Sequence, residues 1–197
     1  HQVDDSAFLR AVVADVRKRV PIDRERVFAT GMSNGGMMCH RLARECADVF
    51  AGIAPVSGAM NFTTVDSPLP MAVMIVHGTK DEMVRFEGGR PERKHGRAGD
   101  RVDASVADAA RYYRARNGLA GEPEVATEGV ARIETWRGED GALPVRVVAI
   151  DGGGHAWPGG RNSGLPGADT PADWDATKAI WQFFAQVRRP LPSAAPR

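Results

Sequence analysis

The chain has 197 residues, and its hydrophobic content of 43% is typical of a single globular domain with a sizeable core. Its formal net charge is only +1, and acidic and basic residues are interspersed, so we expect neither a nucleic-acid-binding surface nor a polybasic membrane patch. Every apolar run is shorter than the roughly 18 residues of a membrane-spanning helix, so we do not expect the chain to insert into a bilayer.

Helices and short apolar strands alternate along the chain. The first helix is predicted over residues 4–20, where apolar residues recur on one helical face and Pro21 follows. In chain order we then expect a strand at 26–31, a helix at 35–50, strands within 51–60 and 71–76, a helix at 102–118, strands within 131–138 and 143–155, and a helix at 175–187. Asp103 and Ser105 are both candidate N-caps for the third helix. Residues 1–188 form the predicted domain, and the proline-rich tail 189–197 is expected to be disordered.

Apolar strands that alternate with helices predict a mainly parallel sheet with helices on both faces, in the α/β class. Functional residues of such sheets gather at the carboxyl ends of the strands. That rule selects three segments of this chain, residues 31–36, 77–81 and 152–160.

The first of these segments holds a serine between two glycines, in the order Gly31-Met32-Ser33-Asn34-Gly35. A serine hydroxyl becomes a nucleophile when a sharp turn holds its oxygen away from the backbone, beside a base and beside N–H groups that stabilise an oxyanion. Gly31 and Gly35 are interpreted as the positions where that turn leaves no room for a side chain. Ser33 is therefore the predicted nucleophile, and the N–H of Asn34 the predicted oxyanion donor.

A base and an acid are expected later in the chain, in the order serine, acid, histidine. His155 follows the last strong strand in a glycine-rich loop and is the predicted base. Asp81 is the favoured acid, with Glu82 and Asp151 as alternatives; its task would be to fix the tautomer of His155. The other histidines, His40, His77 and His95, are expected to include solvated ones.

Two further features have ordinary interpretations. Cys39 and Cys46 lie seven residues apart on a predicted helix, roughly 10 Å, which is too far for a disulfide. They are either free, buried thiols or one of them pairs outside this chain. The basic segment 90–101 is interpreted as a solvated surface loop.

Several segments together resemble the polyhydroxybutyrate depolymerase and feruloyl esterase family of α/β-hydrolases, which is related to acetyl xylan esterases. They are VDDSAFLRAVV, RVFATGMSNGGMM, FAGIAPVSG, VHGTKDEMV and GGGHAWPGG, spread from about Val3 to the last helix. The resemblance implies a serine esterase without cofactor or metal, in which Ser33, Asp81 and His155 form the triad. It makes Trp157 either a wall of the acyl or polymer pocket or a core residue.

The same resemblance implies an ester substrate, either a polyester such as polyhydroxybutyrate or a feruloyl or acetyl ester of plant polysaccharide, and an extracellular or cell-envelope location. In that family the nucleophile follows the fifth of eight strands, whereas here one helix and one strand precede Ser33. We therefore expect the C-terminal portion of the fold, without the loop that supplies the second oxyanion donor. The alternative is a non-catalytic hydrolase-like fragment or interaction module. A nucleotide-binding α/β protein is disfavoured because no phosphate-binding loop is present.

Overall fold

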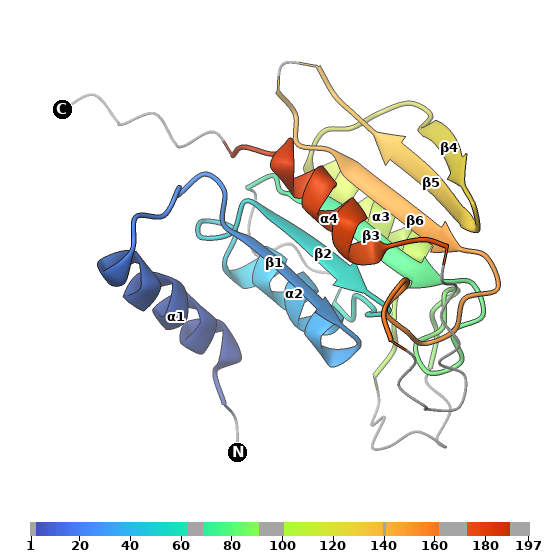
Figure 1. The fold of residues 1–197 in the computed structure, drawn as a ribbon, viewed down its shortest axis with the longest axis horizontal. Coiled ribbons are helices and arrows are strands. Elements are labelled where there is room, and N and C mark those ends of the chain that lie inside the picture. Colours follow the sequence, from blue (N-terminus) through green and yellow to red (C-terminus); the bar gives the residue numbers. More distant parts are fainter. Residues whose placement is uncertain (1–2, 63–68, 91–100, 140, 162–172, 190–197) are drawn as a thin grey trace.

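The structure, a computed structural model, describes residues 3–62, 69–90, 101–139, 141–161 and 173–189. Within these residues, six strands form one sheet in the order β1-β2-β3-β6-β5-β4 (Figure 1). Four of them are parallel to one another, namely β1 (Phe28–Met32), β2 (Gly52–Val56), β3 (Ala72–Gly78) and β6 (Val145–Ile150). The antiparallel strands β5 (Ala131–Trp136) and β4 (Glu124–Glu128) complete the sheet. The expected mainly parallel sheet is confirmed.

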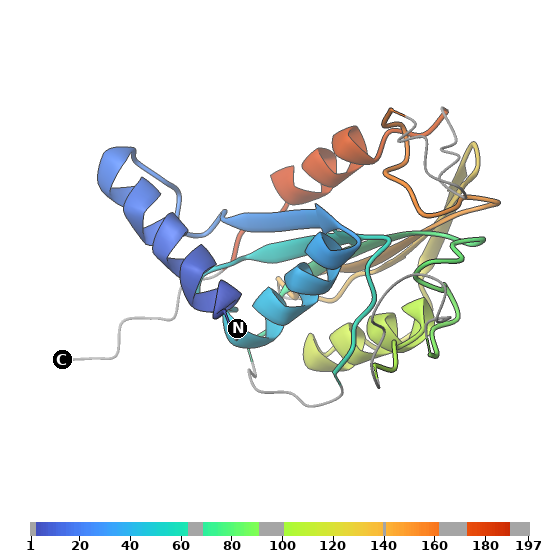
Figure 2. The same ribbon diagram turned by 90° about the horizontal axis from the view of Figure 1, so that it is seen from below.

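Helices cover both faces of this sheet, as predicted. Figure 2 shows α2 (Asn34–Glu45) and α3 (Val106–Arg116) on one face and α4 (Ala176–Ala185) on the other. The first helix, α1 (Asp5–Arg19), lies beside α2 at the β1 end of the molecule. Each face has its own hydrophobic cluster, and the buried side chains of α2 and α3 contribute to one and those of α4 to the other.

The central strand β3 shows why the parallel strands are mostly apolar and do not alternate between apolar and polar residues. Val73 and Ile75 pack into the cluster beneath α2 and α3, whereas Met74 and Val76 pack into the cluster beneath α4. Successive residues of a strand point to opposite faces, so a strand buried on both faces is apolar at consecutive positions and not only at alternate ones. All seven residues of β3 are buried accordingly.

The third helix begins after one of its two predicted N-caps. Ser105 is the N-cap, and its hydroxyl accepts the backbone N–H of Asp108 at 3.0 Å. Asp103, the other candidate, forms a backbone bridge with Gly89 instead. Gly118 follows the helix with a φ of 68°, a conformation that glycine adopts without strain.

Two features of the fold, strand β4 and the exposure of α1, were not expected from the sequence. Strand β4 was not predicted because all of its residues are exposed, so its sequence lacks apolar alternation. On α1, Phe8 and Val12 belong to the predicted apolar face but are 62% and 39% exposed. Only Leu9 and Val13 of that face pack against the core.

The packed part of the chain extends at least to Arg189, which is one residue into the predicted tail. Arg189 was assigned to the disordered tail, but it is buried, its backbone N–H donates to Glu25 at 3.1 Å, and its guanidinium donates to the carbonyl of Ala47. The remainder of that tail, and most of the basic segment 90–101 with His95, lie outside the described residues. In the described parts, no helix has the length and apolar character needed to cross a membrane.

Both cysteines are free and buried, which agrees with the first of the two alternatives. Burial raises the pKa of Cys39 to about 12, because an apolar environment disfavours the thiolate. Cys39 therefore remains a protonated core thiol at neutral pH.

A polar network crosses the core between α2, α3 and the loop after β2. His40 is 1% exposed, which contradicts a solvated position for it. Its Nε2 lies 3.3 Å from the carbonyl of Gly58 and must donate there, so its Nδ1 accepts the hydroxyl of Tyr113 at 2.9 Å. Burial lowers the pKa of His40 to about 4, and the imidazole is neutral in the folded protein.

This network should make stability depend on pH. Below about pH 6.5 the unfolded chain protonates His40, whereas the folded chain does so only near pH 4, so folding stability falls as the pH is lowered through this window. The expected loss attributable to His40 by pH 4.5 is on the order of 2 kcal/mol. Urea unfolding of the wild type and of His40→Gln at both ends of the window measures it. Equal pH dependence in the two proteins would contradict the assignment.

Candidate active site

Ser33 is the single residue between the end of β1 and the start of α2. Its φ of 56° and ψ of −117° are rare for a residue with a side chain and cost of order 1–3 kcal/mol. Its backbone N–H donates to Val56 of the neighbouring strand at 2.9 Å, and its carbonyl accepts the N–H of Met37 at 2.9 Å. Although Ser33 occupies the N-cap of α2, its hydroxyl makes no capping bond. A strained turn therefore holds the serine oxygen at the carboxyl edge of the sheet without a capping hydrogen bond.

The glycines around Ser33 have different reasons to be there. A Cβ on Gly31 would lie 2.8 Å from the backbone of Gly35, and one on Gly36 would lie 2.9 Å from the Cα of Gly58. A Cβ on Gly35 would meet no atom within 4 Å. The interpretation of the motif was thus correct for Gly31 and wrong for Gly35. The tight contacts of the turn involve Gly36, which lies outside the motif.

The carboxylate of Asp81 is buried in the loop after β3. One oxygen, Oδ1, accepts the backbone N–H groups of Met83 and Val84 at 3.0 and 2.8 Å. The other, Oδ2, lies 2.9 Å from Nδ1 of His155. Burial raises the pKa of Asp81, but hydrogen bonds from His155, from a second histidine and from the Val84 amide outweigh burial and hold the pKa well below its usual range. Asp81 is therefore ionised at neutral pH.

The structure thus brings together Asp81 and His155, two of the three predicted triad members. Because a carboxylate can only accept, Nδ1 of His155 carries the proton and its Nε2 is left as an acceptor. The alternative acids, Glu82 and Asp151, are exposed. Among the described residues, no hydrogen bond joins the hydroxyl of Ser33 to His155, and such contacts commonly tighten only when substrate binds.

Close backbone packing ties the loop of Asp81 to the loop of His155. A Cβ on Gly78 would lie 2.2 Å from the carbonyl oxygen of Gly153, so only glycine allows this approach. Thr79 adds two hydrogen bonds, because its N–H donates to Ile150 at 3.0 Å and its hydroxyl accepts the N–H of Gly152 at 2.9 Å. The two loops are held as one unit at the end of β3 and β6.

Ser57 connects the histidine loop to the neighbourhood of Ser33. It follows β2 with a φ of 45°, is buried, and donates its hydroxyl to the carbonyl of Ala156 at 3.4 Å. Its neighbour Val56 accepts the N–H of Ser33. Sequence analysis did not identify Ser57, and its only signal was its place at the end of an apolar strand.

His77 is the second histidine beside Asp81 and was also missed. It is 1% exposed, and Nε2 lies 2.7 Å from the carbonyl of Val84 and 3.3 Å from Oδ2 of Asp81. The ring of Phe86 packs edge-on against it, with the ring centroids 5.9 Å apart. His77 is therefore not one of the solvated histidines expected among the three, because the His77-Gly78 pair ends a strand that is buried on both faces. Its spacing of four residues from Asp81 was the available signal.

The remaining predicted site residues lie at the same edge of the sheet. Asn34 is exposed, and its backbone N–H donates to no acceptor in the described chain, as expected of the first residue of a helix. Trp157 is half-buried against the cluster beneath α4, and its indole N–H donates to Thr177 at 3.0 Å. This packing accounts for Trp157 as a structural residue, and a role as pocket wall stays a prediction.

Several known proteins are similar to this chain. Residues 3–71 match the prolyl oligopeptidase family. The chain is 33% identical to NocK of Nocardia uniformis subsp. tsuyamanensis, a protein assigned to the esterases, over 79% of this chain and 49% of NocK. It is 28% identical to feruloyl esterase B of Piromyces equi, over 78% of this chain and 29% of that protein.

Among solved structures, the acetyl xylan esterase of Aspergillus awamori aligns with a TM-score of 0.55 at 13% identity, over 91% of this chain and 66% of that structure. At such a low sequence identity, the structural similarity shows a shared fold and nothing about function. The chain has the α/β-hydrolase fold. It corresponds to the C-terminal portion of that fold, and it spans less than two thirds of the length of the curated relatives described above.

The two glycines of the motif should respond in opposite ways to the same substitution. Gly31→Ala forces a Cβ against backbone and should destabilise the fold by about 1–3 kcal/mol or more. Gly35→Ala places a Cβ in open space on a helix and should be neutral or stabilising by up to about 1 kcal/mol. Urea denaturation of the matched pair gives both values. A destabilised Gly35→Ala would show that the turn, as described, is wrong.

Proposed function

We propose that this chain carries the catalytic triad of a serine carboxylic ester hydrolase, composed of Ser33, Asp81 and His155. The observation that carries the proposal is the 2.9 Å contact between Nδ1 of His155 and Oδ2 of Asp81, at the same edge of the sheet as a strained serine whose hydroxyl caps nothing. The esterase names of the sequence relatives support it.

In the proposed acylation step, the Oγ of Ser33 attacks the ester carbonyl carbon, and its proton moves to Nε2 of His155. The imidazolium that forms is stabilised by the ionised Asp81 through Nδ1–H. Negative charge develops on the carbonyl oxygen, where the N–H of Asn34 and the N-terminal end of α2 can stabilise it. The intermediate then breaks its bond to the leaving alcohol, which takes the proton from His155.

Deacylation repeats these roles with water as the nucleophile. His155 removes a proton from water, the resulting hydroxide attacks the acyl carbon, and the acid is released as Ser33 regains its proton. One oxyanion donor is available on this chain in Asn34. A second donor is proposed to come from sequence that precedes this part of the fold in full-length relatives, because loss of one donor costs roughly 10²-fold to 10³-fold in rate.

The proposed substrate class is a feruloyl or acetyl ester of a plant polysaccharide. This choice rests on relatives named as feruloyl esterases and as a bifunctional acetylxylan esterase/xylanase, the latter from Neocallimastix patriciarum at 26% identity. A polyester such as polyhydroxybutyrate is the alternative, and comparing release from feruloylated or acetylated xylan with release from polyhydroxybutyrate distinguishes them. The extracellular or cell-envelope location remains a prediction of the family resemblance.

Covalent labelling tests the nucleophile directly. A fluorophosphonate should form an adduct on Ser33, located by peptide mass spectrometry, because it reacts with an activated serine hydroxyl. Ser33→Ala should abolish the label and p-nitrophenyl butyrate hydrolysis, while Ser57→Ala should keep the label. The 197-residue chain should be tested alone and also fused to the N-terminal segment of a longer relative. If neither protein is labelled at Ser33, the chain is a non-catalytic hydrolase-like module and the proposal fails.

The contact of His77 with Asp81 predicts a positioning role. His77→Leu removes the donor beside Oδ2 of Asp81 and should lower kcat by roughly 10-fold to 100-fold with little change in KM, because misplaced catalytic groups slow the chemical step. His77→Gln keeps an N–H near the same place and should recover part of the loss. Thermal denaturation of both variants controls for folding. Equal kcat in His77→Leu and wild type would contradict the role.

A further inference from the structure

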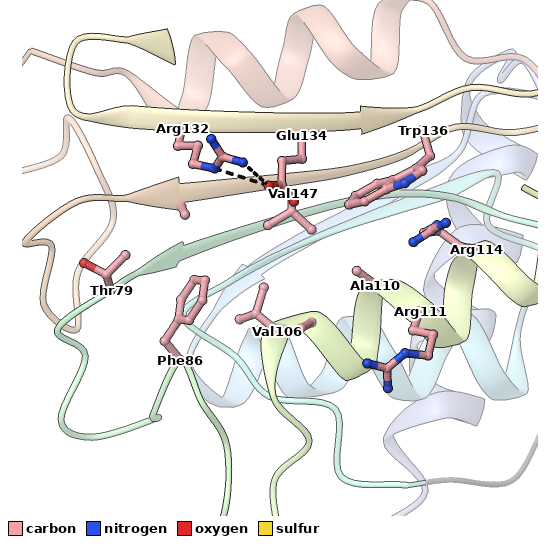
Figure 3. A pocket seen from close by; sticks show the side chains of 12 residues that line it. Thr79, Phe86, Val106, Ala110, Arg111, Arg114, Arg132, Glu134, Trp136 and Val147 are labelled. Carbon is pink, nitrogen blue, oxygen red and sulfur yellow. Dashed lines mark hydrogen bonds and ion pairs between the residues drawn. The ribbon is translucent and has the colours of Figure 1, made fainter. Parts of the chain in front are cut away.

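A cavity separate from the serine turn lies between α3 and the sheet. Its volume is about 460 Å³, within the range of small-molecule sites. Figure 3 shows it running beneath β5 and β6, with Phe86 toward one end and Trp136 toward the other. None of Ser33, Asp81 and His155 lines it. It lies under the half of the sheet that is farther from β1.

The cavity exists because α3 presents small side chains to the sheet. Ala107 and Ala110 line it from the helix, and Val147 and Ala149 line it from β6. Two antiparallel strands, β5 and β4, extend the sheet beyond β6. The helix α3 packs mainly against β3 and β6. The face of β5 is thus left partly uncovered by the helix, and aliphatic and aromatic surfaces surround the resulting space.

Charge at the cavity is unbalanced in favour of cations. Three arginines and one glutamate line it, a difference of two positive charges. Arg132 is neutralised by Glu134, with hydrogen bonds of 2.7 and 3.2 Å, and Arg111 pairs with Asp108. Arg114 has a different environment from both.

Arg114 has no carboxylate partner in the described chain. Its guanidinium donates to the carbonyl of Gly121 at 2.9 Å and lies 4.6 Å from the ring centroid of Trp136. A carbonyl and an aromatic face hold the guanidinium in place without cancelling its charge. Figure 3 shows Arg114 beside Trp136 at the same end of the cavity. An anchored cation next to an aromatic wall is suited to a ligand with both an apolar body and an anionic group.

We propose that this cavity binds a small, planar, apolar monocarboxylate. Its ring system would lie over Ala110 and Val147 between the two aromatic side chains, and its carboxylate would pair with Arg114. A single negative charge matches the one cavity arginine that lacks a carboxylate partner among the described residues. The proposal does not depend on esterase activity, because the lining residues take no part in the proposed reaction.

Calorimetric titration of the 197-residue chain with 2-naphthoate, and in parallel with the neutral 2-naphthalenemethanol, tests the proposal. Arg114→Gln should weaken 2-naphthoate binding roughly tenfold or more, because it removes a charge-assisted hydrogen bond, which is stronger than one between neutral groups. It should leave 2-naphthalenemethanol unchanged. Arg137→Gln is the matched control, since it removes the same charge from an exposed arginine on the same sheet edge that lies outside the cavity, and it should alter 2-naphthoate binding less than twofold.

A second variant tests the location. Ala107→Phe starts from an exposed position on α3 and should occlude the cavity without disturbing the core, so it should abolish binding of both compounds while the melting temperature is retained. Three results would overturn the proposal: no saturable binding of 2-naphthoate, equal affinities for the acid and the alcohol, or binding that survives Ala107→Phe in a folded protein.

Discussion

Direct contact between backbones at the carboxyl edge of the sheet is the constraint on which the rest of this site depends. Gly36 meets Gly58, and Gly78 meets Gly153, at distances where an added Cβ would lie 2.2–2.9 Å from backbone atoms of the other segment. These contacts set how close the turn of Ser33, the loop of Asp81 and the loop of His155 can come. Hydrogen bonds such as the one between Asp81 and His155 form because the backbones already lie at that separation.

The buried histidines show a second consequence of this close packing. His40 lies behind the serine turn and His77 lies behind Asp81, and each donates an N–H to a backbone carbonyl of a loop at this edge. A loop carbonyl buried without a partner is costly, so a side-chain donor from the core is needed there. The polar groups of the core thus satisfy the loops, and apolar residues fill both faces of the sheet.

Much of this arrangement could be predicted from the sequence, because its signals are local. Five strands, four helices and the contact between Asp81 and His155 follow from apolar runs, caps and the order of residues along the chain. Strand β4 could not be predicted, because an exposed edge strand lacks an apolar pattern. The contact of Gly36 with Gly58 joins segments distant in sequence, so no local pattern contains it. For His77 the sequence offered only its spacing of four residues from Asp81.

The strain at Ser33 links the stability of the sheet to the chemistry proposed for it. A residue stays in an unfavourable conformation only when its surroundings impose it. Here the N–H of Ser33 is held by Val56 of β2, and its carbonyl is held by α2. Within the described residues, β1 pairs only with β2, and its residues are half-buried or exposed, whereas those of β2 are fully buried. The turn is therefore supported from one side of its strand. Gly31 and Met32 of β1 lead into Ser33 without an intervening loop. Any partner that paired with the other edge of β1 would therefore constrain the geometry of Ser33 directly.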